Sequence, residues 1–556
     1  MARPETFDYV VVGAGSAGCV LAGRLSEDLE ARVLLLEAGP VDHPWAWQLH
    51  MPAALAYPLK DQRYNWGYWS EPEPYLDGRR MYCPRGRVLG GSSSINGMAY
   101  VRGHARDYDR WAQSGLRGWD YAHVLPYFKR AETRAQGGDD YRGDGGPLQV
   151  ATGACRNPLY QAFIEAGRQA GYPVTPDMNG HQQEGFGPMD MTVRAGRRWS
   201  AARAYLDPAR RRPNLTVRTR ALTRRVRFED TRAVAVEYVR RGRPREVRAE
   251  REVILAGGAI NSPQLLMLSG IGDADHLRPL DVALVAHLPG VGRNLQDHLE
   301  IYLQHACTQP ISLYETQKPW SKLRIGVEWI LFKRGLGATS HFEAGAFIRS
   351  RAGVEHPDLQ YHFLPIAMNY DGSNPQRTHG FQAHVGPMRP TSVGRVRLRS
   401  ADPREAPSIL FNYMATEGDR QEMRAAVRLT RELFAQRAFD PYLGPELAPG
   451  AEIETDGEID AFVRTRAESA YHPCGTCKMA LESDPTAVVD EQCRVRGVEG
   501  LHVADASIMP SIVSGNLNAP TIMLAEKAAD LIRGRPPLDP LEVPVYIAPN
   551  WETAQR

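Results

Sequence analysis

Hydrophobic residues in the first forty positions follow the order strand, turn, helix, strand. Residues 7–12 form a short β-branched apolar run, as expected of a buried parallel strand. Helical spacing follows over residues 16–29, and a second apolar run covers residues 32–36. This order predicts a βαβ unit and therefore a doubly wound α/β sheet at the start of the fold.

Later patterns predict further elements of both kinds. Residues 214–255 contain several short runs that alternate apolar with polar positions, typical of strands. A helix is expected next, with Ser262 as its N-cap and Pro263 at its first position. Residues 417–436 carry their apolar side chains on one stripe, which predicts an amphipathic surface helix. Another helix is predicted over residues 519–532.

Length and charge narrow the class of protein. A chain of 556 residues exceeds one ordinary domain, and its 43% hydrophobic and 24% charged residues are typical of a globular protein. Its 67 basic and 65 acidic residues nearly cancel and are interleaved throughout. We therefore expect no nucleic-acid partner.

Cysteine usage and hydropathy bear on location. The seven cysteines are mostly far apart, and no run of 18 apolar residues occurs, so we expect a reduced cytoplasmic protein without a membrane-spanning helix. Four glycines interrupt residues 9–25, which favours a strand–turn–helix over a signal peptide. Cys474 and Cys477 lack two further nearby zinc ligands, so we predict thiols rather than a metal site.

A glycine-rich turn separates the first strand from the first helix. Gly13 allows the tight turn, Gly15 allows backbone to approach a pyrophosphate, and Gly18 allows the helix to pack on the strand. Ser16 opens the helix. Glu37 ends the second strand, where its carboxylate can accept hydrogen bonds from ribose hydroxyls and would repel the 2′-phosphate of NADP. The motif predicts dinucleotide binding without distinguishing FAD from NAD.

A second glycine-rich loop, GRVLGGSSSING at residues 86–97, resolves that ambiguity. It resembles the first signature of the glucose–methanol–choline (GMC) oxidoreductases, and residues 258–272 resemble the second. The resemblance extends over about residues 7–533 and implies FAD as cofactor. It implies these cofactor-binding residues: Gly13, Gly15, Ser16, Gly18, Glu37, Gly90, Gly91, Ser92, Asn96, Asp505, Ala506 and Asn518.

The resemblance also implies an architecture. We expect a doubly wound, Rossmann-like FAD-binding domain and an α+β substrate domain with an antiparallel sheet. The FAD-binding domain is predicted to be discontinuous, over residues 1–160, 208–310 and 467–540. The substrate domain takes residues 161–207 and 311–466, and residues 541–556 form an extended tail. Ile95 stands where many family members carry a histidine bonded to FAD, so non-covalent FAD is predicted.

The segment YHPCGT at residues 471–476 matches the catalytic region of the family. The match assigns catalytic roles to His472 and to Asn516. Within the family the chain most resembles the bacterial choline dehydrogenases, through segments such as LQDHLE and HFEAG. A trimethylammonium group requires aromatic faces and a carboxylate. The resemblance therefore implies substrate-binding residues, which are Glu300, Phe342, His362 and Tyr471.

The implied reaction is the oxidation of choline to betaine aldehyde and then to glycine betaine. Hydride would pass to flavin N5, with His472 as acid and base. A quinone or respiratory electron acceptor is expected rather than NAD or oxygen. That acceptor would require peripheral contact with the inner membrane, for which the C-terminal tail is one candidate. Two alternatives stay open: a GMC dehydrogenase or oxidase for another primary alcohol, and a non-redox lyase with this fold.

Overall fold

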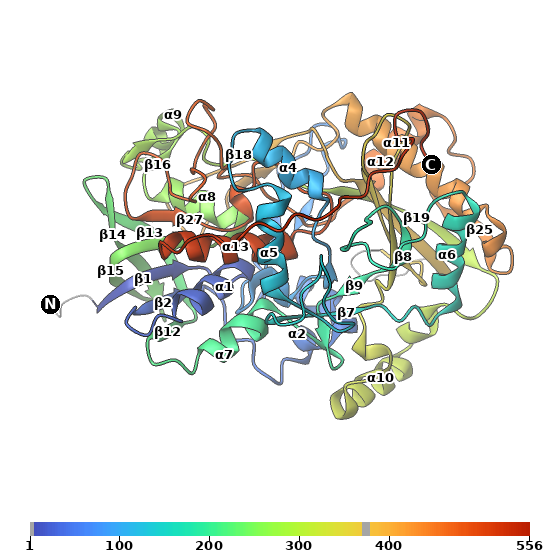
Figure 1. Ribbon diagram of the computed structural model, residues 1–556, viewed down its shortest axis with the longest axis horizontal. Helices are drawn as coiled ribbons and strands as arrows, with labels where there is room; N and C mark the ends of the chain where they lie inside the picture. Colours follow the sequence, from blue (N-terminus) through green and yellow to red (C-terminus); the bar gives the residue numbers. More distant parts are fainter. Residues whose placement is uncertain (1–4, 370–377) are drawn as a thin grey trace.

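Two seven-stranded sheets organise the computed structural model, which describes residues 5–369 and 378–556 (Figure 1). The parts of the predicted domains at residues 1–4 and 370–377 lie outside this description. The first sheet has the order β12-β2-β1-β15-β14-β13, with β27 paired to β15. Its strands are β1 (Glu5–Val12), β2 (Val33–Leu36), β12 (Leu215–Arg218), β13 (Ala221–Glu229), β14 (Arg232–Arg240), β15 (Arg243–Leu255) and β27 (Leu501–Val503).

The first sheet is parallel where it carries the glycine-rich turn. Strand β1 pairs in parallel with β2 and β15, whereas β13 and β14 extend the sheet as antiparallel hairpins. Helix α1 (Ser16–Leu25) follows the turn and packs against α13 (Asn518–Ile532). Helix α1 ends four residues earlier than predicted, because the Ser26 hydroxyl donates to the Ala22 carbonyl and the chain turns there.

The helix after β15 corrects one prediction. Helix α8 (Gly258–Leu268) begins four residues before the expected N-cap, and Pro263 lies inside it. Because proline has no N–H, the Ala259 carbonyl loses its helical donor; the Thr476 hydroxyl donates to it instead, at 2.6 Å. Ser262 caps no helix; its hydroxyl donates to Asp505 at 2.6 Å. The Ser262 hydroxyl and the Ala259 carbonyl therefore both bond to the C-terminal region, and these bonds fasten α8 to it.

The second sheet is antiparallel, with the order β25-β19-β22-β21-β20-β8 and β26 paired to β19. Its strands are β8 (Gly185–Pro188), β19 (Leu299–Cys307), β20 (Ala344–Ile348), β21 (Leu359–Leu364), β22 (Gly380–Pro387), β25 (Leu443–Ala448) and β26 (Glu468–Ser469). The doubly wound α/β fold with a second, antiparallel sheet is confirmed. Because β19 pairs only within this sheet, we propose that the second FAD-binding segment, predicted as residues 208–310, ends before Leu299 instead.

Helices cover the outer side of the second sheet. The predicted surface helix is α11 (Glu417–Phe434), and Met423, Val427 and Leu433 of its apolar stripe are buried. Helix α11 packs against β22 and against α6 (Pro158–Gln169). An ion pair of Arg424 with Asp460, in which both side chains are largely buried, joins α11 to the neighbouring helix α12 (Asp456–Arg466).

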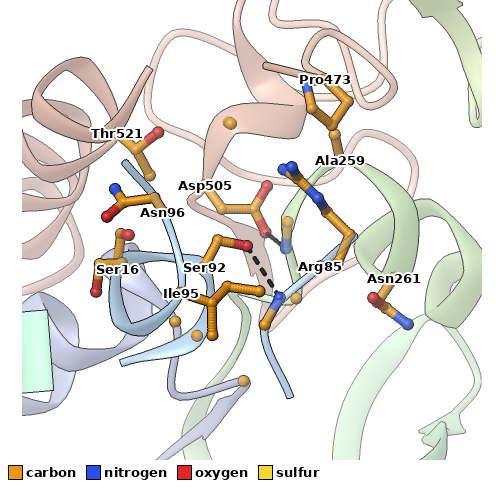
Figure 2. Close-up of a pocket in the computed structure, with 18 of the residues that line it drawn as sticks. Ser16, Arg85, Ser92, Ile95, Asn96, Ala259, Asn261, Pro473, Asp505 and Thr521 are labelled. Atoms are coloured by element: carbon orange, nitrogen blue, oxygen red, sulfur yellow. Dashed lines mark hydrogen bonds between the residues drawn. The ribbon is translucent and has the colours of Figure 1, made fainter. Parts of the chain in front are cut away.

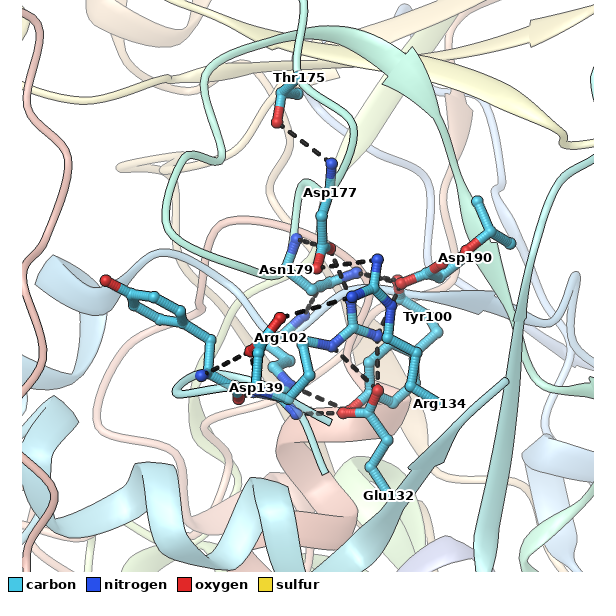
Figure 3. Close-up of polar contacts among 12 residues, drawn as sticks. Tyr100, Arg102, Glu132, Arg134, Asp139, Thr175, Asp177, Asn179 and Asp190 are labelled. Carbon is cyan, nitrogen blue, oxygen red and sulfur yellow. Dashed lines mark hydrogen bonds and ion pairs between the residues drawn. The ribbon is translucent and has the colours of Figure 1, made fainter. Parts of the chain in front are cut away.

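A buried ionic cluster joins several short strands and loops (Figure 3). Arg142 contacts Glu132 at 2.5 Å, Asp177 at 2.5 Å and Asp190 at 2.7 Å. Arg102 makes a second, short ion pair with Glu132. Both arginines are fully buried, so their charges depend on these carboxylates for compensation.

The C-terminal tail crosses the molecular surface from one sheet to the other, as the dark red trace in Figure 1 shows. The Leu541 N–H donates to the Ala122 carbonyl at 2.9 Å, and further along the tail the Trp551 carbonyl accepts from the Gly353 N–H at 2.7 Å. The tail therefore packs on the protein itself. Among the described residues no helix is both long and apolar enough to span a membrane. All seven cysteines lie in the described ranges, and each is buried and unpaired with another.

Candidate active site

One cavity is lined by residues of both sheets and by almost all of the predicted site residues. Figure 2 shows part of this lining. The predicted site residues that line it are Gly13, Gly15, Ser16, Glu37, Gly91, Ser92, Asn96, Glu300, Phe342, His362, Tyr471, His472, Asp505, Ala506, Asn516 and Asn518. Gly18 and Gly90 do not line it. A Cβ at Gly18 would lie 1.8 Å from the Gly13 carbonyl oxygen, so this glycine acts in packing.

The two glycine-rich loops meet at one end of the cavity. Gly91 has φ +52°, and a Cβ placed there would lie 2.5 Å from the Cα of Gly15. Gly13 has φ +101°, and its Cβ would lie 2.5 Å from the carbonyl oxygen of Ala256. Close backbone approach and positive φ therefore require glycine at positions 13 and 91, whereas a Cβ at Gly15 would meet nothing closer than 3.9 Å. No described side chain caps the N-terminus of α1, so its first N–H groups are available to an anion such as a diphosphate.

Glu37 lies beside this turn and is buried. One carboxylate oxygen accepts from the Ala14 N–H at 2.9 Å, and the other from the Gly39 N–H at 2.7 Å. Burial raises the pKa of Glu37 to about 7. Each oxygen keeps a second lone pair, and Glu37 lines the cavity, so its carboxylate has the capacity to accept from a ribose hydroxyl.

Residues from the C-terminal region close the same end of the cavity. Asp505 accepts from the Gly258 N–H at 2.7 Å, and Figure 2 shows this bond. The Ser16 hydroxyl donates to the Asn518 side chain at 2.8 Å, which joins α1 to the start of α13. Ser92 accepts from the Gly86 N–H at 3.1 Å. The predicted cofactor residues therefore form one connected wall, although 502 positions separate Ser16 from Asn518.

At the other end, His472 and Asn516 face each other. Nε2 of His472 lies 3.0 Å from Nδ2 of Asn516, and Nδ1 of His472 lies 3.0 Å from Nδ1 of His298. Nε2 of His298 lies 2.9 Å from the Met388 carbonyl oxygen, which can only accept. His298 must therefore carry its proton on Nε2, and its Nδ1 accepts from Nδ1–H of His472. That chain leaves a lone pair on Nε2 of His472.

Burial keeps both imidazoles neutral. It lowers the pKa of His298 to about 4 and holds the pKa of His472 well below its usual value of 6.5. The backbone around them is fixed by the buried Asp297, which accepts from the His472 N–H at 2.6 Å and from the hydroxyls of Tyr413 and Ser469. A neutral imidazole with Nε2 free can accept a proton.

A carboxylate and aromatic rings lie nearby. Glu300 on β19 is buried, and its Oε1 lies 3.2 Å from Nδ1 of His384 on β22. The side-chain oxygen of Gln382 accepts from the Met368 N–H. The side-chain nitrogen of Gln382 therefore lies toward His384 and donates to its Nε2. His384 therefore donates to Glu300 through Nδ1. Glu300 keeps its acceptor character toward the cavity.

The ring of Phe342 closes this part of the cavity. Its centroid lies 5.7 Å from that of His362 and 5.9 Å from that of His384, edge to face in both cases. Nε2 of His362 lies 3.4 Å from the Asn516 oxygen, so His362 links the ring cluster to the His472–Asn516 pair. Burial lowers the pKa of His362.

Tyr471 adopts the left-handed conformation, with φ +64°. Such a backbone is costly for a non-glycine residue and is held only by its neighbours. Arg85 donates to the Tyr471 carbonyl at 2.7 Å, and the Ser469 hydroxyl accepts from the Tyr471 N–H at 2.9 Å. This strained turn directs the next residue, His472, into the cavity.

Several residues of this site escaped the sequence analysis. His298 lies inside the LQDHLE segment that carried part of the family resemblance, so a signal for it existed. His384 had none, because it lies in an ordinary apolar strand. Arg198 is a buried cation that contacts the backbone of the glycine-rich loop and the Asn96 side chain at 2.7 Å. Nothing in the sequence around Arg198 indicates burial.

Comparison with known proteins gives a consistent assignment. Two family models described as GMC oxidoreductase match residues 7–300 and 390–525. The chain is 61% identical to human mitochondrial choline dehydrogenase, over 99% of this chain and 94% of the relative. It is 58% identical to the oxygen-dependent choline dehydrogenase of Brucella ovis, over 99% of this chain and 100% of the relative.

Solved structures agree with this assignment at the level of the fold. Pyridoxine 4-oxidase from Mesorbium loti is 34% identical with a TM-score of 0.86, covering 95% of this chain and 100% of the other. A formate oxidase is 26% identical with a TM-score of 0.88, covering 96% and 99%. The two family models and the full-length relatives together show that this chain belongs to the GMC oxidoreductase family.

Proposed function

We propose that the protein oxidises choline to betaine aldehyde, and the hydrated aldehyde to glycine betaine, with FAD as its cofactor. The observation that carries the proposal is the single cavity in which the His472–Asn516 pair faces Glu300 and Phe342. The choline dehydrogenases of human and Brucella ovis, similar over nearly the whole chain, support the substrate.

The proton of the alcohol goes to His472. In the absence of substrate, Asn516 donates to Nε2 of His472 at 3.0 Å. An alcohol oxygen inserted between them donates its proton to Nε2 and accepts from Asn516. As the proton leaves, the oxygen gains negative charge, and the Asn516 N–H together with the new imidazolium stabilises it. His362 borders the same oxygen position.

The cation of choline is held by charge and ring faces. A trimethylammonium group has no hydrogen-bond donors, so it gains most from a carboxylate and from aromatic surfaces. Glu300 supplies the charge, while Phe342 and Tyr471 supply surfaces. His384 orients Glu300 through the 3.2 Å hydrogen bond.

FAD fits the residues at the opposite end. The close approach of Gly15 and Gly91 and the uncapped start of α1 suit a diphosphate, and Glu37 suits a ribose. When bound, FAD supplies the acceptor for the hydride of the alcohol carbon. Ile95 lines the cavity and has no nucleophilic atom, so we propose that FAD is held without a covalent bond through this position.

The names of the two relatives differ in what they say of the electron acceptor. The name of the Brucella ovis relative specifies oxygen dependence, whereas that of the human relative names no acceptor. A quinone or respiratory acceptor, peripheral membrane contact and a cytoplasmic location remain predictions.

Anaerobic mixing with choline tests the proposal. We expect choline to bleach the flavin absorbance in a single turnover and to yield betaine aldehyde. His472→Ala should slow bleaching by about 100-fold or more while leaving FAD bound. A lyase would leave the flavin oxidised, and unimpaired bleaching in the variant would remove His472 from the mechanism.

A neutral analogue separates choline from other alcohols. In 3,3-dimethylbutan-1-ol a carbon replaces the choline nitrogen, so shape is retained and charge is lost. We expect Glu300→Gln to raise the choline KM strongly and to leave the KM of the analogue nearly unchanged. A wild-type enzyme that handles both alcohols equally well would favour another primary alcohol as the substrate.

A further inference from the structure

Exposed apolar side chains are concentrated on one part of the surface. Of the 18 large apolar residues exposed in the described chain, ten lie in residues 45–57 and 320–336. Those ten are Trp45, Trp47, Tyr57, Trp320, Leu323, Val327, Ile330, Leu331, Phe332 and Leu336. We name this region the α10 surface, after helix α10 (Pro319–Phe332), which carries most of it. A patch of this extent indicates a binding surface, because exposed apolar residues that bind nothing are usually scattered singly over a protein.

Helix α10 has two apolar faces. Ile325 and Trp329 are buried against Met51 and Ala54, and this face attaches the helix to the protein. A second stripe runs through positions 320, 323, 327, 330 and 331, at the spacing of one helix face, and every residue in it is about half or more exposed. Packing within the chain therefore accounts for only one of the two faces.

Cationic side chains border the exposed stripe. Lys318, Lys322, Arg324 and Arg334 are all exposed, and Lys333 lies between Phe332 and Arg334. Of the seven lysines in the whole sequence, three belong to this segment, and Lys60 ends the short helix α3 (Ala56–Lys60), whose Tyr57 is part of the α10 surface. The acidic residues of segment 315–334 are Glu315 and Glu328, so its formal charge is net positive. The apolar stripe with flanking cations matches an anionic lipid surface.

The position and length of α10 suit a helix that lies on a bilayer. Figure 1 shows α10 at the lower margin of the molecule, projecting beyond the other elements. Its 14 residues are too few to cross the hydrocarbon core, which requires about 20. The tryptophans at positions 45, 47 and 320 are the side chains favoured at the depth of lipid headgroups.

A second cavity, of about 650 Å³, opens beneath this surface. Leu323, Val327 and Ile330 of α10 line its outer part, and Phe342 and His384 line its inner part. The last two residues also line the proposed active site. The second cavity therefore adjoins the proposed active site, and the α10 surface covers its outer side.

We propose that the α10 surface docks this protein on an anionic phospholipid bilayer. The exposed stripe and the tryptophans insert among the lipid headgroups, and the bordering lysines and arginines contact lipid phosphates. In this orientation the second cavity faces the lipid phase. The proposal does not depend on the identity of the alcohol.

Vesicle flotation of the full chain with FAD bound tests this proposal. Vesicles of phosphatidylcholine containing about one third phosphatidylglycerol should carry the protein upward, and vesicles of phosphatidylcholine alone should carry much less. The variant W320S/L331S/F332S should lose about tenfold or more of the binding, since these three side chains are exposed and do not line the second cavity. The variant K318E/R324E should lose the preference for anionic vesicles.

A matched variant controls for the loss of apolar surface. L29S/W69S/L284S removes three side chains exposed to a similar degree elsewhere, and it should float like the wild type. Flavin absorbance and thermal midpoint should be unchanged in every variant. Absence of flotation with anionic vesicles would overturn the proposal, as would equal flotation of W320S/L331S/F332S and the wild type. A wild-type oligomer that this variant abolishes, without vesicle binding, would assign the surface to a second copy instead.

Discussion

The hydrogen bond between His298 and His472 leads to a test that separates two functions of one side chain. His298 donates from Nε2 to the Met388 carbonyl and accepts at Nδ1 from His472. The amide oxygen of Asn can occupy the place of Nδ1, whereas the amide of Gln reaches the place of Nε2. His298→Asn therefore retains the contact with His472, and His298→Gln retains only that with Met388.

The expected magnitude follows from the hydrogen bond that is lost. A buried neutral hydrogen bond contributes about 1–1.5 kcal/mol net. Without it, the ratio of the His472 tautomer that leaves Nε2 unprotonated to the other tautomer falls by about five- to tenfold. His298→Gln should therefore slow the chemical step by up to about that factor. Choline affinity should change little, because Glu300 and Phe342 remain in place.

Anaerobic stopped-flow measurement of flavin bleaching at saturating choline provides the assay. The limiting rate should fall in His298→Gln and be largely restored in His298→Asn, with similar apparent choline dissociation constants in both. The reasoning would be refuted by equal rates in the two variants. It would also fail if the Gln variant lost affinity rather than rate, since His298 would then act on substrate binding.

Three further outcomes follow from other parts of the structure. Gly91→Ala should purify with little FAD, because its Cβ meets Gly15 at 2.5 Å; Gly242→Ala, also at positive φ but with open space around it, should keep full flavin content by absorbance. Arg142→Met should lower the free energy of unfolding in urea by about 3 kcal/mol or more, because it leaves buried carboxylates uncompensated, whereas loss of the exposed Arg168 pair should leave that free energy nearly unchanged. In a pH profile, kcat/KM should fall on the acid side only well below pH 6.5. Burial lowers the pKa of His472, so the neutral base persists until the pH drops through this lowered pKa. A fall in kcat/KM that begins above pH 7 on the acid side would contradict this reasoning.

Local patterns predicted the first sheet well because its elements depend on nearby residues. The β-branched run of β1 and the glycines at positions 13 and 15 meet constraints within one βαβ unit. The start of α8 could not be predicted in this way. The donor that allows Pro263 inside the helix is Thr476, 217 positions from the Ala259 carbonyl it satisfies.

The candidate site likewise contains residues that the sequence indicated and residues that it did not. The family resemblance indicated His472 and Glu300, both of which line the cavity. The side chains that orient them are distant in sequence: 174 positions separate His298 from His472, and 84 separate His384 from Glu300. No short motif records such partners. Their roles depend on which ring nitrogen carries a proton, and only the three-dimensional arrangement of acceptors determines that.

The C-terminal tail constrains how the molecule can move. Near its start it is bonded to the Ala122 carbonyl, and near its end Arg349 donates to the Ala554 carbonyl at 2.8 Å while Arg556 pairs with Glu432. A segment fastened at both ends resists hinge opening of the two halves. Ligands must then enter and leave through local rearrangements of side chains and loops. Truncation before residue 541 would remove this restraint, and a tag fused to the C-terminus would strain the contacts of Ala554 and Arg556.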